Sequence, residues 1–391
     1  MRIVDVCAFY TPVGGGVKTY VERKLRTARA GSREIVIVVP GERDGTRRVG
    51  DAGSIVTIAS PRFPLDRRYR YFADEAALHR VLDGLAPDVI EASSPWNSPA
   101  MVARWQGDAV RSLVMHADPL SAYAYRWFGG VAARDTIDRG FDWFWRHLRR
   151  LDDSFDMIVC ASDSLSTRLR AGGLRKVMTI PMGVEPGVFS PAHRDEALRA
   201  RLLARCGLGP EATLLVGAGR LAPEKRWPMV IEATTAAGYA SPVGLVLLGN
   251  GRDRARVVRT VAANPHIHLG APITERDAFA RVLASADALV HGCEAETFCM
   301  VAAEARASGL PLIVPDDGGA GDQFVAGQGY SYPAHDAAGL AGAIGTFLAD
   351  GSSLHRGAAI LAAPQIPDMD DHFARLFAAY DRAAMRVSAA A

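Results

Sequence analysis

The sequence predicts an α/β protein built from two doubly wound domains. Short runs of β-branched and other apolar residues recur along the chain, and segments of helix length separate them. Most of these runs are continuously apolar, as expected for parallel strands that are covered on both faces. Strands and helices alternate along the first half of the chain and again along the second half, so we expect two doubly wound sheets.

The strands expected in the first half are Ile3–Ala8, Ile35–Val39, Ile55–Ala59, Asp88–Ala92, Ser112–His116, Met157–Ala161 and Val177–Ile180. Those expected in the second half are Thr213–Ala218, Gly244–Leu248, His266–Leu269, Asp287–Val290, Pro311–Val314 and Tyr330–Tyr332. The Gly- and Pro-rich segment 181–187 separates the halves, so we assign residues 1–182 to a first domain and 183–367 to a second. Residues 368–391 are predicted to form an amphipathic helix that packs back on the first domain.

Length and composition are those of a soluble globular protein. The 391 residues are 49% hydrophobic and 23% charged, and a chain of this length has room for two domains of ordinary size. The net charge of +2 does not indicate a nucleic-acid binder, although residues 1–182 carry 27 Lys and Arg against 21 Asp and Glu. This excess would suit an anionic partner such as a phospholipid surface, but a solvated basic face is the commoner explanation.

The five cysteines are scattered and form no pair with metal-ligand spacing, so a reducing compartment fits. Cys7 and Cys160 lie in strand-like runs and are expected in the core. Residues 1–6 have the pattern of a strand and not of a signal peptide. No apolar run approaches the roughly 20 residues that span a bilayer. We therefore expect a cytoplasmic protein that is at most peripheral on the inner face of the cell membrane.

Segment 291–311 is the most informative part of the chain. Glu296 follows an expected strand, and Glu304 lies in a helical segment that Gly309 and Pro311 end. In doubly wound domains, ligands bind beyond the carboxyl ends of the strands. Both acids are therefore candidate ligand-binding residues, and by themselves they could also serve acid/base hydrolysis.

A basic pair follows the first expected strand of the second half. Arg220 comes directly after Gly219, and Lys225 follows five residues later. A guanidinium binds phosphate through two hydrogen bonds and an ammonium acts as a point charge, so the pair suits a diphosphate. An exposed basic pair without a ligand is the alternative. With cations placed for a diphosphate, Glu296 and Glu304 are better explained as groups that bind hydroxyls.

Three glycine-containing loops also follow expected strands. Gly14-Gly15-Gly16 precedes a helix and suits a phosphate or sugar, or else a tight turn. It has neither the Walker A order nor the dinucleotide-binding pattern. Asn250, within Leu248–Gly251, and Gly270, which begins the loop 270–274, are weaker candidates for contacts with a nucleoside and the edge of its base.

His116 closes an expected strand at its carboxyl end, where an imidazole can bond a reacting hydroxyl, although a structural role is as well founded. Two stretches, 62–72 and 123–150, mix Arg with aromatic residues. Such a mixture suits a lipid headgroup surface or a lipid-acceptor groove. A core role is the alternative, because Phe144, Trp145 and Leu148 have helical spacing.

Taken together, these motifs resemble the retaining GT-B glycosyltransferases of family 4 over nearly the whole chain. The resemblance is carried by the loop 14–16, by Gly219-Arg220 with Lys225, and by Glu296-Thr297-Phe298 through Glu304. It implies a GT-B fold, in which two domains face each other across a cleft. It also implies transfer of a sugar from a nucleoside-diphosphate donor, with a UDP-sugar favoured over GDP-mannose. The acceptor is expected to be a lipid or glycan intermediate of the cell envelope.

The resemblance also implies roles for individual residues. Glu304 would bond the ribose of the donor, and Glu296 the transferred sugar. Arg220 and Lys225 would neutralise the diphosphate leaving group, so neither a metal nor a cofactor is expected. His116 would lie near the reacting centre. Further donor contacts are expected from Gly15, Gly16, Gly219, Asn250, Gly270, Phe298, Cys299 and Met300.

One departure from the family pattern concerns the loop after the first acid. Many relatives have Gly-Phe-Gly there, and this chain has Thr297-Phe298-Cys299, which puts the identity of the donor in doubt. Two other functions remain open. One is a nucleotide-sugar epimerase or phosphorylase on the same fold, of which the epimerase needs no acceptor. The other is a two-lobed sugar-binding protein without activity, which would release no nucleotide.

Overall fold

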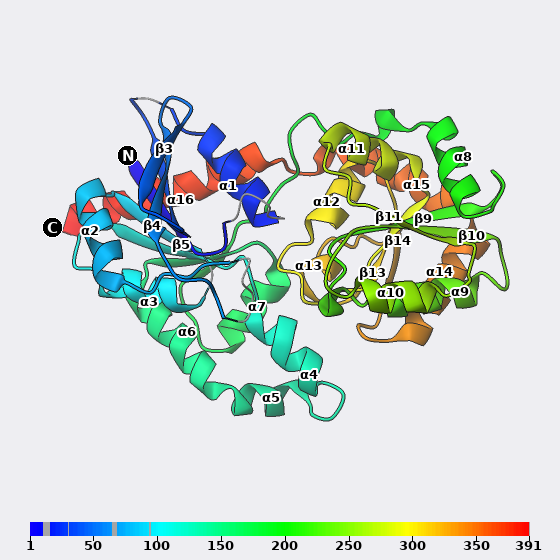
Figure 1. Cartoon of the computed structure of the whole chain (residues 1–391), viewed down its shortest axis with the longest axis horizontal. Helices are drawn as coiled ribbons and strands as arrows, with labels where there is room; N and C mark the ends of the chain where they lie inside the picture. Colours follow the sequence, from blue (N-terminus) through cyan, green and yellow to red (C-terminus); the bar gives the residue numbers. More distant parts are fainter. Residues whose placement is uncertain (11–15, 30, 65–68, 94, 391) are drawn as a thin grey trace. The chain divides into compact units, whose positions relative to one another are not determined.

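The computed structural model describes residues 1–10, 16–29, 31–64, 69–93 and 95–390 (Figure 1). The chain divides into two compact units. Unit 1 contains Met1–Asp118, Phe128–Pro181 and Asp370–Ala391, and unit 2 contains Pro119–Trp127 and Met182–Met369. The division expected from the sequence placed Pro119–Trp127 with the first domain.

Unit 1 is built on a sheet with the strand order β3-β4-β2-β1-β5-β6-β7-β8. All neighbouring strands are parallel except β3 and β4. The strands are β1 Arg2–Cys7, β2 Glu34–Gly41, β3 Gly45–Val49, β4 Gly53–Ala59, β5 Val89–Ser93, β6 Val110–Val114, β7 Met157–Cys160 and β8 Val177–Thr179. The helices are α1 Gly16–Arg26, α2 Glu75–Leu85, α3 Asn97–Arg104, α5 Arg134–Gly140, α6 Asp142–Ser154, α7 Asp163–Ala171 and α16 Met369–Ala390. A π-turn, η1 Leu120–Tyr125, and a short helix, α4 Arg126–Phe128, precede α5 along the chain, and η1 and the first two residues of α4 belong to unit 2.

The strands of unit 1 follow the apolar runs of the sequence, with one exception. The buried centre of the sheet pairs β1 with β2 in parallel, with Ile3 opposite Ile35. Strand β3 was not predicted, because its residues are polar and exposed except Val49 and it lies at an edge of the sheet. Cys7 and Cys160 are buried, as predicted.

Unit 2 has a parallel sheet with the order β11-β10-β9-β12-β13-β14. Its strands are β9 Thr213–Ala218, β10 Val243–Leu248, β11 Ile267–Gly270, β12 Ala288–Val290, β13 Leu312–Pro315 and β14 Gly329–Tyr332. Its helices are α8 Glu196–Arg205, α9 Trp227–Ala237, α10 Arg254–Val261, α11 Arg276–Ser285, α12 Met300–Ala307, α13 Gly318–Gly321, α14 Ala337–Asp350 and α15 Ser352–Ala362, with 3₁₀ turns η2 Pro191–His193, η3 Pro223–Lys225 and η4 Ala363–Gln365.

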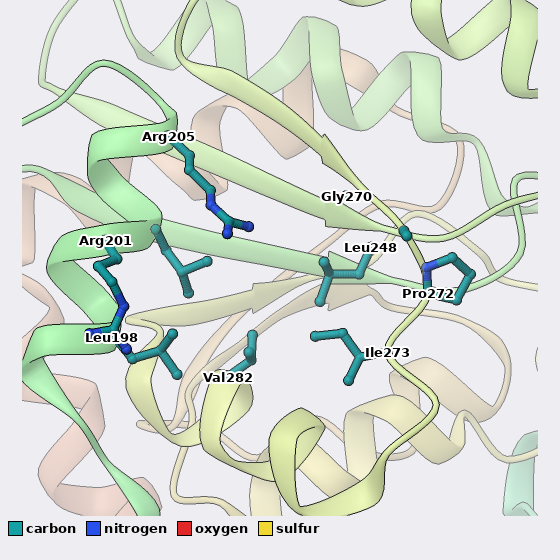
Figure 2. A pocket seen from close by; sticks show the side chains of 10 residues that line it. Leu198, Arg201, Arg205, Leu248, Gly270, Pro272, Ile273 and Val282 are labelled. Carbon is teal, nitrogen blue, oxygen red and sulfur yellow. The ribbon is translucent and has the colours of Figure 1, made fainter.

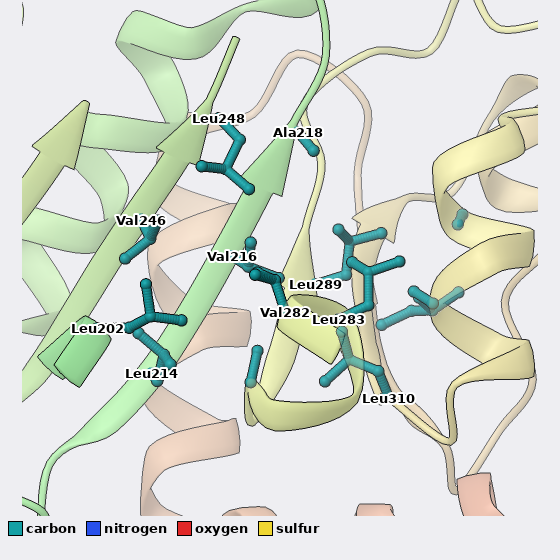
Figure 3. Close-up of a cluster of buried hydrophobic side chains, with 14 of the residues drawn as sticks. Leu202, Leu214, Val216, Ala218, Val246, Leu248, Val282, Leu283, Leu289 and Leu310 are labelled. Atoms are coloured by element: carbon teal, nitrogen blue, oxygen red, sulfur yellow. The ribbon is translucent and has the colours of Figure 1, made fainter. Parts of the chain in front are cut away.

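Both faces of the second sheet are covered by helices. Leu214 and Val216 of β9 face the cluster formed with α8, α11 and α12 (Figure 3). Leu215, between them, belongs to the opposite cluster with α9, α10 and α14. Successive strand residues point to opposite faces, so a strand covered on both sides must be apolar throughout. This explains the continuous apolar runs and confirms the predicted fold class, two doubly wound α/β sheets.

The C-terminal helix α16 has the amphipathic pattern that the sequence predicts. Phe373, Leu376, Phe377 and Tyr380 are buried, and the hydroxyl of Tyr380 donates to the carboxylate of Glu91 at 2.7 Å. Among the described residues, no helix is both long enough and apolar enough to cross a bilayer.

Candidate functional site

The first group of candidate residues follows β9 in unit 2. Gly219 has a φ of +153°, which glycine adopts without strain. The side chain of Arg220 is 60% exposed and pairs with Glu224 at 3.2 Å. Lys225 is the last residue of η3, and its side chain is only 14% exposed. The end of β9 and the turn after it therefore supply two cations, one in solvent and one largely covered.

Lys225 contacts the acidic loop that follows β12. Its ammonium binds Oε1 of Glu296, and Nε2 of His291 lies 3.2 Å from the same oxygen. His291 is fully buried. An ionised carboxylate only accepts hydrogen bonds, so Nε2 of His291 carries the proton in this contact. The three side chains form one compact polar group at the carboxyl ends of β9 and β12.

Burial and charge act against each other in this group. Burial alone would raise the pKa of Glu296, but Lys225 and His291 outweigh it and hold that pKa well below its ordinary value. Burial alone would lower the pKa of Lys225, but Glu296 raises it. The pKa of His291 is lowered by its burial. At neutral pH the group is therefore an ammonium, a carboxylate and a neutral imidazole.

The loop between β12 and α12 is held by close backbone contacts. The N–H of Gly319 donates to the carbonyl of Glu296 at 2.7 Å, and a Cβ on Gly319 would lie 2.5 Å from the nitrogen of Phe298. Phe298 is buried, and Met300 is the first residue of α12. Cys299 caps that helix with a φ of +65°. The second replaced glycine of the family pattern thus lies at a left-handed position, where a side chain is strained.

Glu304 belongs to a second group of charges. It lies in α12, is 5% exposed, and accepts a hydrogen bond from Arg276 at the start of α11. Nε of Arg276 also donates to Glu185 at 3.1 Å. Burial raises the pKa of Glu304, and Arg276 opposes this rise. Glu304 and Glu296 therefore have separate cationic partners.

Several polar residues of these loops were not identified from the sequence. They are His291, Arg276, and the pair Arg226 and Glu294, whose side chains form two hydrogen bonds of 2.8 and 2.7 Å. His291 directly follows β12, so a search for polar residues just beyond the strand ends could have identified it. The ion pairs could not have been found in this way, because 68 residues separate Arg226 from Glu294 along the chain.

The loop after β10 packs against the loop after β9. A Cβ on Gly249 would lie 2.0 Å from the carbonyl oxygen of Gly219, and one on Gly251 would lie 2.3 Å from that of Leu221. The N–H of Leu221 donates to the carbonyl of Asn250 at 2.9 Å. The close packing of the two loops therefore requires glycine at positions 249 and 251 even if no ligand binds there. The exposed side chain of Asn250 stays a predicted nucleoside contact.

Gly270 lines a cavity of about 330 Å³ beside β10 and β11 (Figure 2). Arg201 and Arg205 of α8 lie on one side of it, and Pro272 and Ile273 lie on the other. The lining consists of Leu198, Arg201, Leu202, Arg205, Leu248, Gly270, Ala271, Pro272, Ile273 and Val282. This volume is at the low end of the range for ligand pockets. Apolar walls with guanidinium groups at one side suit a flat molecule with a polar edge.

In unit 1, His116 lies two residues beyond the end of β6, in a loop, and does not end the strand as predicted. Its ring meets the ring of Tyr20 edge-on at 4.6 Å. Burial lowers the pKa of His116 to about 4, while Asp5 opposes and Lys24 assists this shift. The imidazole is therefore neutral at physiological pH and can both donate and accept a hydrogen bond.

The predicted glycine loop lies only partly within the described residues. Gly16 is the first residue of α1 and is exposed. Gly14 and Gly15 lie outside the described residues.

One cluster in the described part of the chain has side chains of the kinds that bind metals. Ligand atoms of His291, Glu296 and Cys299 lie within 4.8 Å of one another. Imidazole, carboxylate and thiolate together suit zinc. However, the ammonium of Lys225 already contacts Glu296, so a cation entering this cluster would meet a like charge.

The geometry of the site favours recognition of a ligand that carries both negative charge and hydroxyl groups. The exposed Arg220 and the covered Lys225 can neutralise an anion. The carboxylates Glu296 and Glu304 can accept hydrogen bonds from hydroxyls at two separate points. A sugar nucleotide has these features in one molecule.

Two family models match the chain. The model described as glycosyl transferases group 1 covers residues 205–359, and the model described as glycosyltransferase family 4 covers residues 14–188. The first includes every candidate residue of unit 2 that is described above except Glu185, Leu198, Arg201 and Leu202.

Among curated proteins, the chain is 31% identical to a GDP-mannose-dependent alpha-mannosyltransferase of Mycobacterium tuberculosis, with 82% of this chain and 81% of that protein aligned. It is 29% identical to a GDP-mannose-dependent alpha-(1-6)-phosphatidylinositol dimannoside mannosyltransferase of the same species, over 80% of this chain and 79% of that protein.

Among solved structures, sucrose-phosphate synthase from Thermosynechococcus elongatus matches with a TM-score of 0.77 and 16% identity, covering 97% of this chain and 98% of that one. Anabaena HepE in complex with UDP and glucose matches with a TM-score of 0.70 and 16% identity, covering 98% of this chain and all of the other. At this identity the likeness concerns the fold alone.

Proposed function

The chain belongs to the group 1 glycosyltransferases of family 4, and we propose that it transfers mannose from GDP-mannose to a hydroxyl of a glycolipid. Glycosyl transfer follows from membership of the family. The donor, the acceptor and the stereochemistry are proposed. The observation that carries the proposal is the contact between Lys225 and Glu296, which joins a phosphate-binding cation to a hydroxyl-binding acid at the ends of β9 and β12.

In the proposed complex, each of the four charged site residues of unit 2 binds a particular part of the donor. Arg220 and Lys225 bind the diphosphate and stabilise the charge that grows on it as the sugar leaves. Glu296 accepts hydrogen bonds from the transferred sugar, and Glu304 accepts them from the ribose. The two cations are the reason for proposing that the reaction needs no bound metal.

GDP-mannose is proposed as the donor because two relatives, at 31% and 29% identity, are named for it. The cavity beside Gly270 supports a purine, since a guanidinium can pair with O6 and N7 of guanine, and Arg201 and Arg205 line the cavity. The sequence alone favoured a UDP-sugar. A UDP-sugar is therefore the second candidate.

We propose that the sugar keeps its anomeric configuration. The leaving diphosphate, held by Arg220 and Lys225, would then help to remove the proton of the attacking hydroxyl on the same face of the sugar. The neutral imidazole of His116 would hydrogen-bond at the reacting centre. NMR analysis of the anomeric configuration of the product tests this part of the proposal.

The acceptor is proposed to be a glycolipid at an anionic membrane surface. Unit 1 has a series of aromatic rings in mutual contact, here called the aromatic surface, in which Trp96, Phe128 and Trp143 are exposed, Phe141 is partly buried and Phe144 is buried. It is formed by Trp96, Phe128, Phe141, Trp143 and Phe144, with centroid distances of 5.7 to 6.5 Å between neighbours. Trp143 is 55% exposed, Phe128 43% and the nearby Val131 86%.

The charge around the aromatic surface suits acidic lipids. Residues 128–150 carry five Arg and three Asp, and the side chain of Arg146 is 65% exposed. Aromatic and aliphatic side chains bury themselves among lipid headgroups, and nearby cations are attracted to anionic lipids.

Vesicle sedimentation tests the membrane part of the proposal. The protein should sediment with phosphatidylglycerol vesicles and stay in solution with phosphatidylcholine vesicles. Trp143→Ser combined with Val131→Ser should reduce this binding several-fold, because both side chains are more than half exposed. Tyr239→Ser removes an even more exposed ring from unit 2, where Tyr239 is 90% exposed, and should bind normally. Equal binding by all three proteins would contradict the proposal.

Nucleotide release tests the donor. Wild-type protein with a membrane extract as acceptor should release GDP from GDP-mannose faster than UDP from UDP-glucose. Faster release from the UDP-sugar would replace GDP-mannose by the second candidate. Turnover of the donor to an epimer without any acceptor would favour an epimerase.

Two variants test the roles of the charged groups. Glu304→Gln should weaken donor binding about 10- to 100-fold, which corresponds to a lost hydrogen bond with a charged partner. Lys225→Ala should lower the rate on the order of 100-fold, as for the loss of a group that stabilises the leaving charge. Glu232→Gln, on the exposed side of α9, is the matched control and should behave as wild type. Normal activity of either site variant would disprove the role assigned to it.

A further inference from the structure

Two consecutive residues, Lys225 and Arg226, each form an ion pair with the acidic loop after β12. Lys225 binds Glu296, and Arg226 binds Glu294 through Nε at 2.8 Å and through its terminal nitrogen at 2.7 Å. Glu294 is nearly inaccessible, with a side chain that is 5% exposed. The proposed function uses the first pair and leaves the second without a role.

The backbone at Arg226 is unusual for a residue with a side chain. Its φ of +50° and ψ of 33° lie in the left-handed region, and the residue joins the end of η3 to the start of α9. A non-glycine residue is strained there and persists only where its surroundings fix it. The paired guanidinium is such a restraint, because a bidentate contact sets both the distance and the plane of the two groups.

The acidic loop is fixed on its other sides by backbone contacts. A Cβ on Gly318 would lie 1.9 Å from the carbonyl oxygen of Glu294, and one on Gly292 would lie 3.0 Å from that of Lys225. The hydroxyl of Tyr332 donates to the carbonyl of His291 at 2.7 Å. The side chains of Arg226 and Glu294 connect this rigid loop to the turn that carries Lys225.

We propose that Arg226 and Glu294 form a positioning pair, which holds the ammonium of Lys225 and the carboxylate of Glu296 at the separation that the donor requires. The inference rests on the proposed function, because it assigns the pair to the same donor site. Arg226 and Glu294 touch each other and the protein, and they act on the donor through Lys225 and Glu296. A displacement of about 1 Å of such groups can cost on the order of 100-fold in rate.

Steady-state kinetics of single and double variants test the pair. Arg226→Gly removes the guanidinium and also relieves the backbone strain, so it should fold well. Its kcat is expected to fall 10- to 100-fold, with a smaller change in the KM for the donor. Glu294→Gln should have a similar effect. The double variant should be no slower than the slower single variant, because the two side chains act as one unit.

A matched control comes from the opposite end of the same sheet. Arg199 binds Asp287 with three hydrogen bonds, of 2.7, 3.1 and 3.2 Å, and Asp287 is 3% exposed. This pair lies at the amino end of β12. Arg199→Ala should lower the melting temperature and leave the kcat of the folded protein unchanged.

The outcomes separate this inference from the proposed function. A normal kcat in Arg226→Gly, or rate losses that multiply in the double variant, would overturn the positioning role. The proposed function would still stand in that case, provided that the wild-type protein turns over the sugar nucleotide. A kcat loss in Arg199→Ala equal to that in Arg226→Gly would show a general effect of instability and would also overturn it. If wild-type protein turns over no sugar nucleotide, the proposed function itself fails.

Discussion

Cys299 combines a buried side chain with a left-handed backbone. It is 2% exposed and has a φ of +65° at the start of α12. The sequence comparison with the family pattern placed a glycine at this position, and glycine is the residue that tolerates this conformation. The chain therefore retains the backbone shape of the family loop and bears the strain of a side chain in it.

Replacement of Cys299 by the two smallest residues separates the strain from the loss of the thiol. Cys299→Gly and Cys299→Ala both remove the buried sulfur, and only alanine keeps a Cβ at positive φ. The glycine variant should be the more stable by up to about 1 kcal/mol, since a left-handed residue with a Cβ costs about 1–2 kcal/mol and glycine gains entropy on unfolding. Urea denaturation of the two variants measures this difference, and a more stable alanine variant would refute it.

At the scale of a single element, α16 brings a histidine into the core of unit 1. His372 is 2% exposed. Its Nδ1 lies 3.0 Å from the carbonyl oxygen of Pro181, to which it must donate, and its Nε2 lies 3.4 Å from the hydroxyl of Tyr20. Burial lowers the pKa of His372 to about 4, although the hydrogen bond to Pro181 opposes this. The helix is therefore docked through a neutral imidazole.

The docking of α16 should weaken in mild acid. An unfolded histidine has a pKa of about 6.5, so between pH 6.5 and about 4 the unfolded chain binds a proton at His372 that the folded chain does not. The stabilising effect is complete above pH 6.5 and is lost as the pH falls towards 4. Because His116 shifts in the same direction, the free energy of unfolding should drop over this range.

Asparagine at position 372 keeps an N–H donor and cannot titrate. In His372→Asn, the slope of the free energy of unfolding between pH 6.5 and 5 should be smaller than in wild type by at most about 1.4 kcal/mol per pH unit. Chemical denaturation at several pH values measures both slopes. Identical slopes would show that His372 does not contribute to the pH dependence.

For the whole molecule, the sequence was sufficient where one physical rule governs many residues. Strands covered on both faces must be apolar throughout, so runs such as Thr213–Ala218 and Ile35–Val39 were found. Strand β3 obeys no such rule, since it is exposed at an edge. The limits of β6 were also misplaced, because Met115 is buried beyond the strand end and extends the apolar run towards His116.

The residues of the candidate site likewise fall into those that could be predicted from the sequence and those that could not. Positions next to strand ends, such as Arg220 and Glu296, could be predicted from local order along the chain. Their partners could not, because pairs such as Arg276 with Glu304 depend on how separate loops meet in the folded unit. The glycines of the loop after β10 show a related difficulty, since packing between two loops and contact with a ligand both call for glycine.

Strand β3 also bears on how copies of the protein behave at high concentration. An outer strand presents unpaired backbone groups onto which a strand of another molecule can add, which leads to aggregation. β3 is short and antiparallel to its neighbour, and Arg47 and Arg48 lie exposed in it. A second molecule that added a strand there would bring the same arginines close together. The polar residues of β3, because of which the strand was not predicted, thus also oppose aggregation through this edge of the sheet.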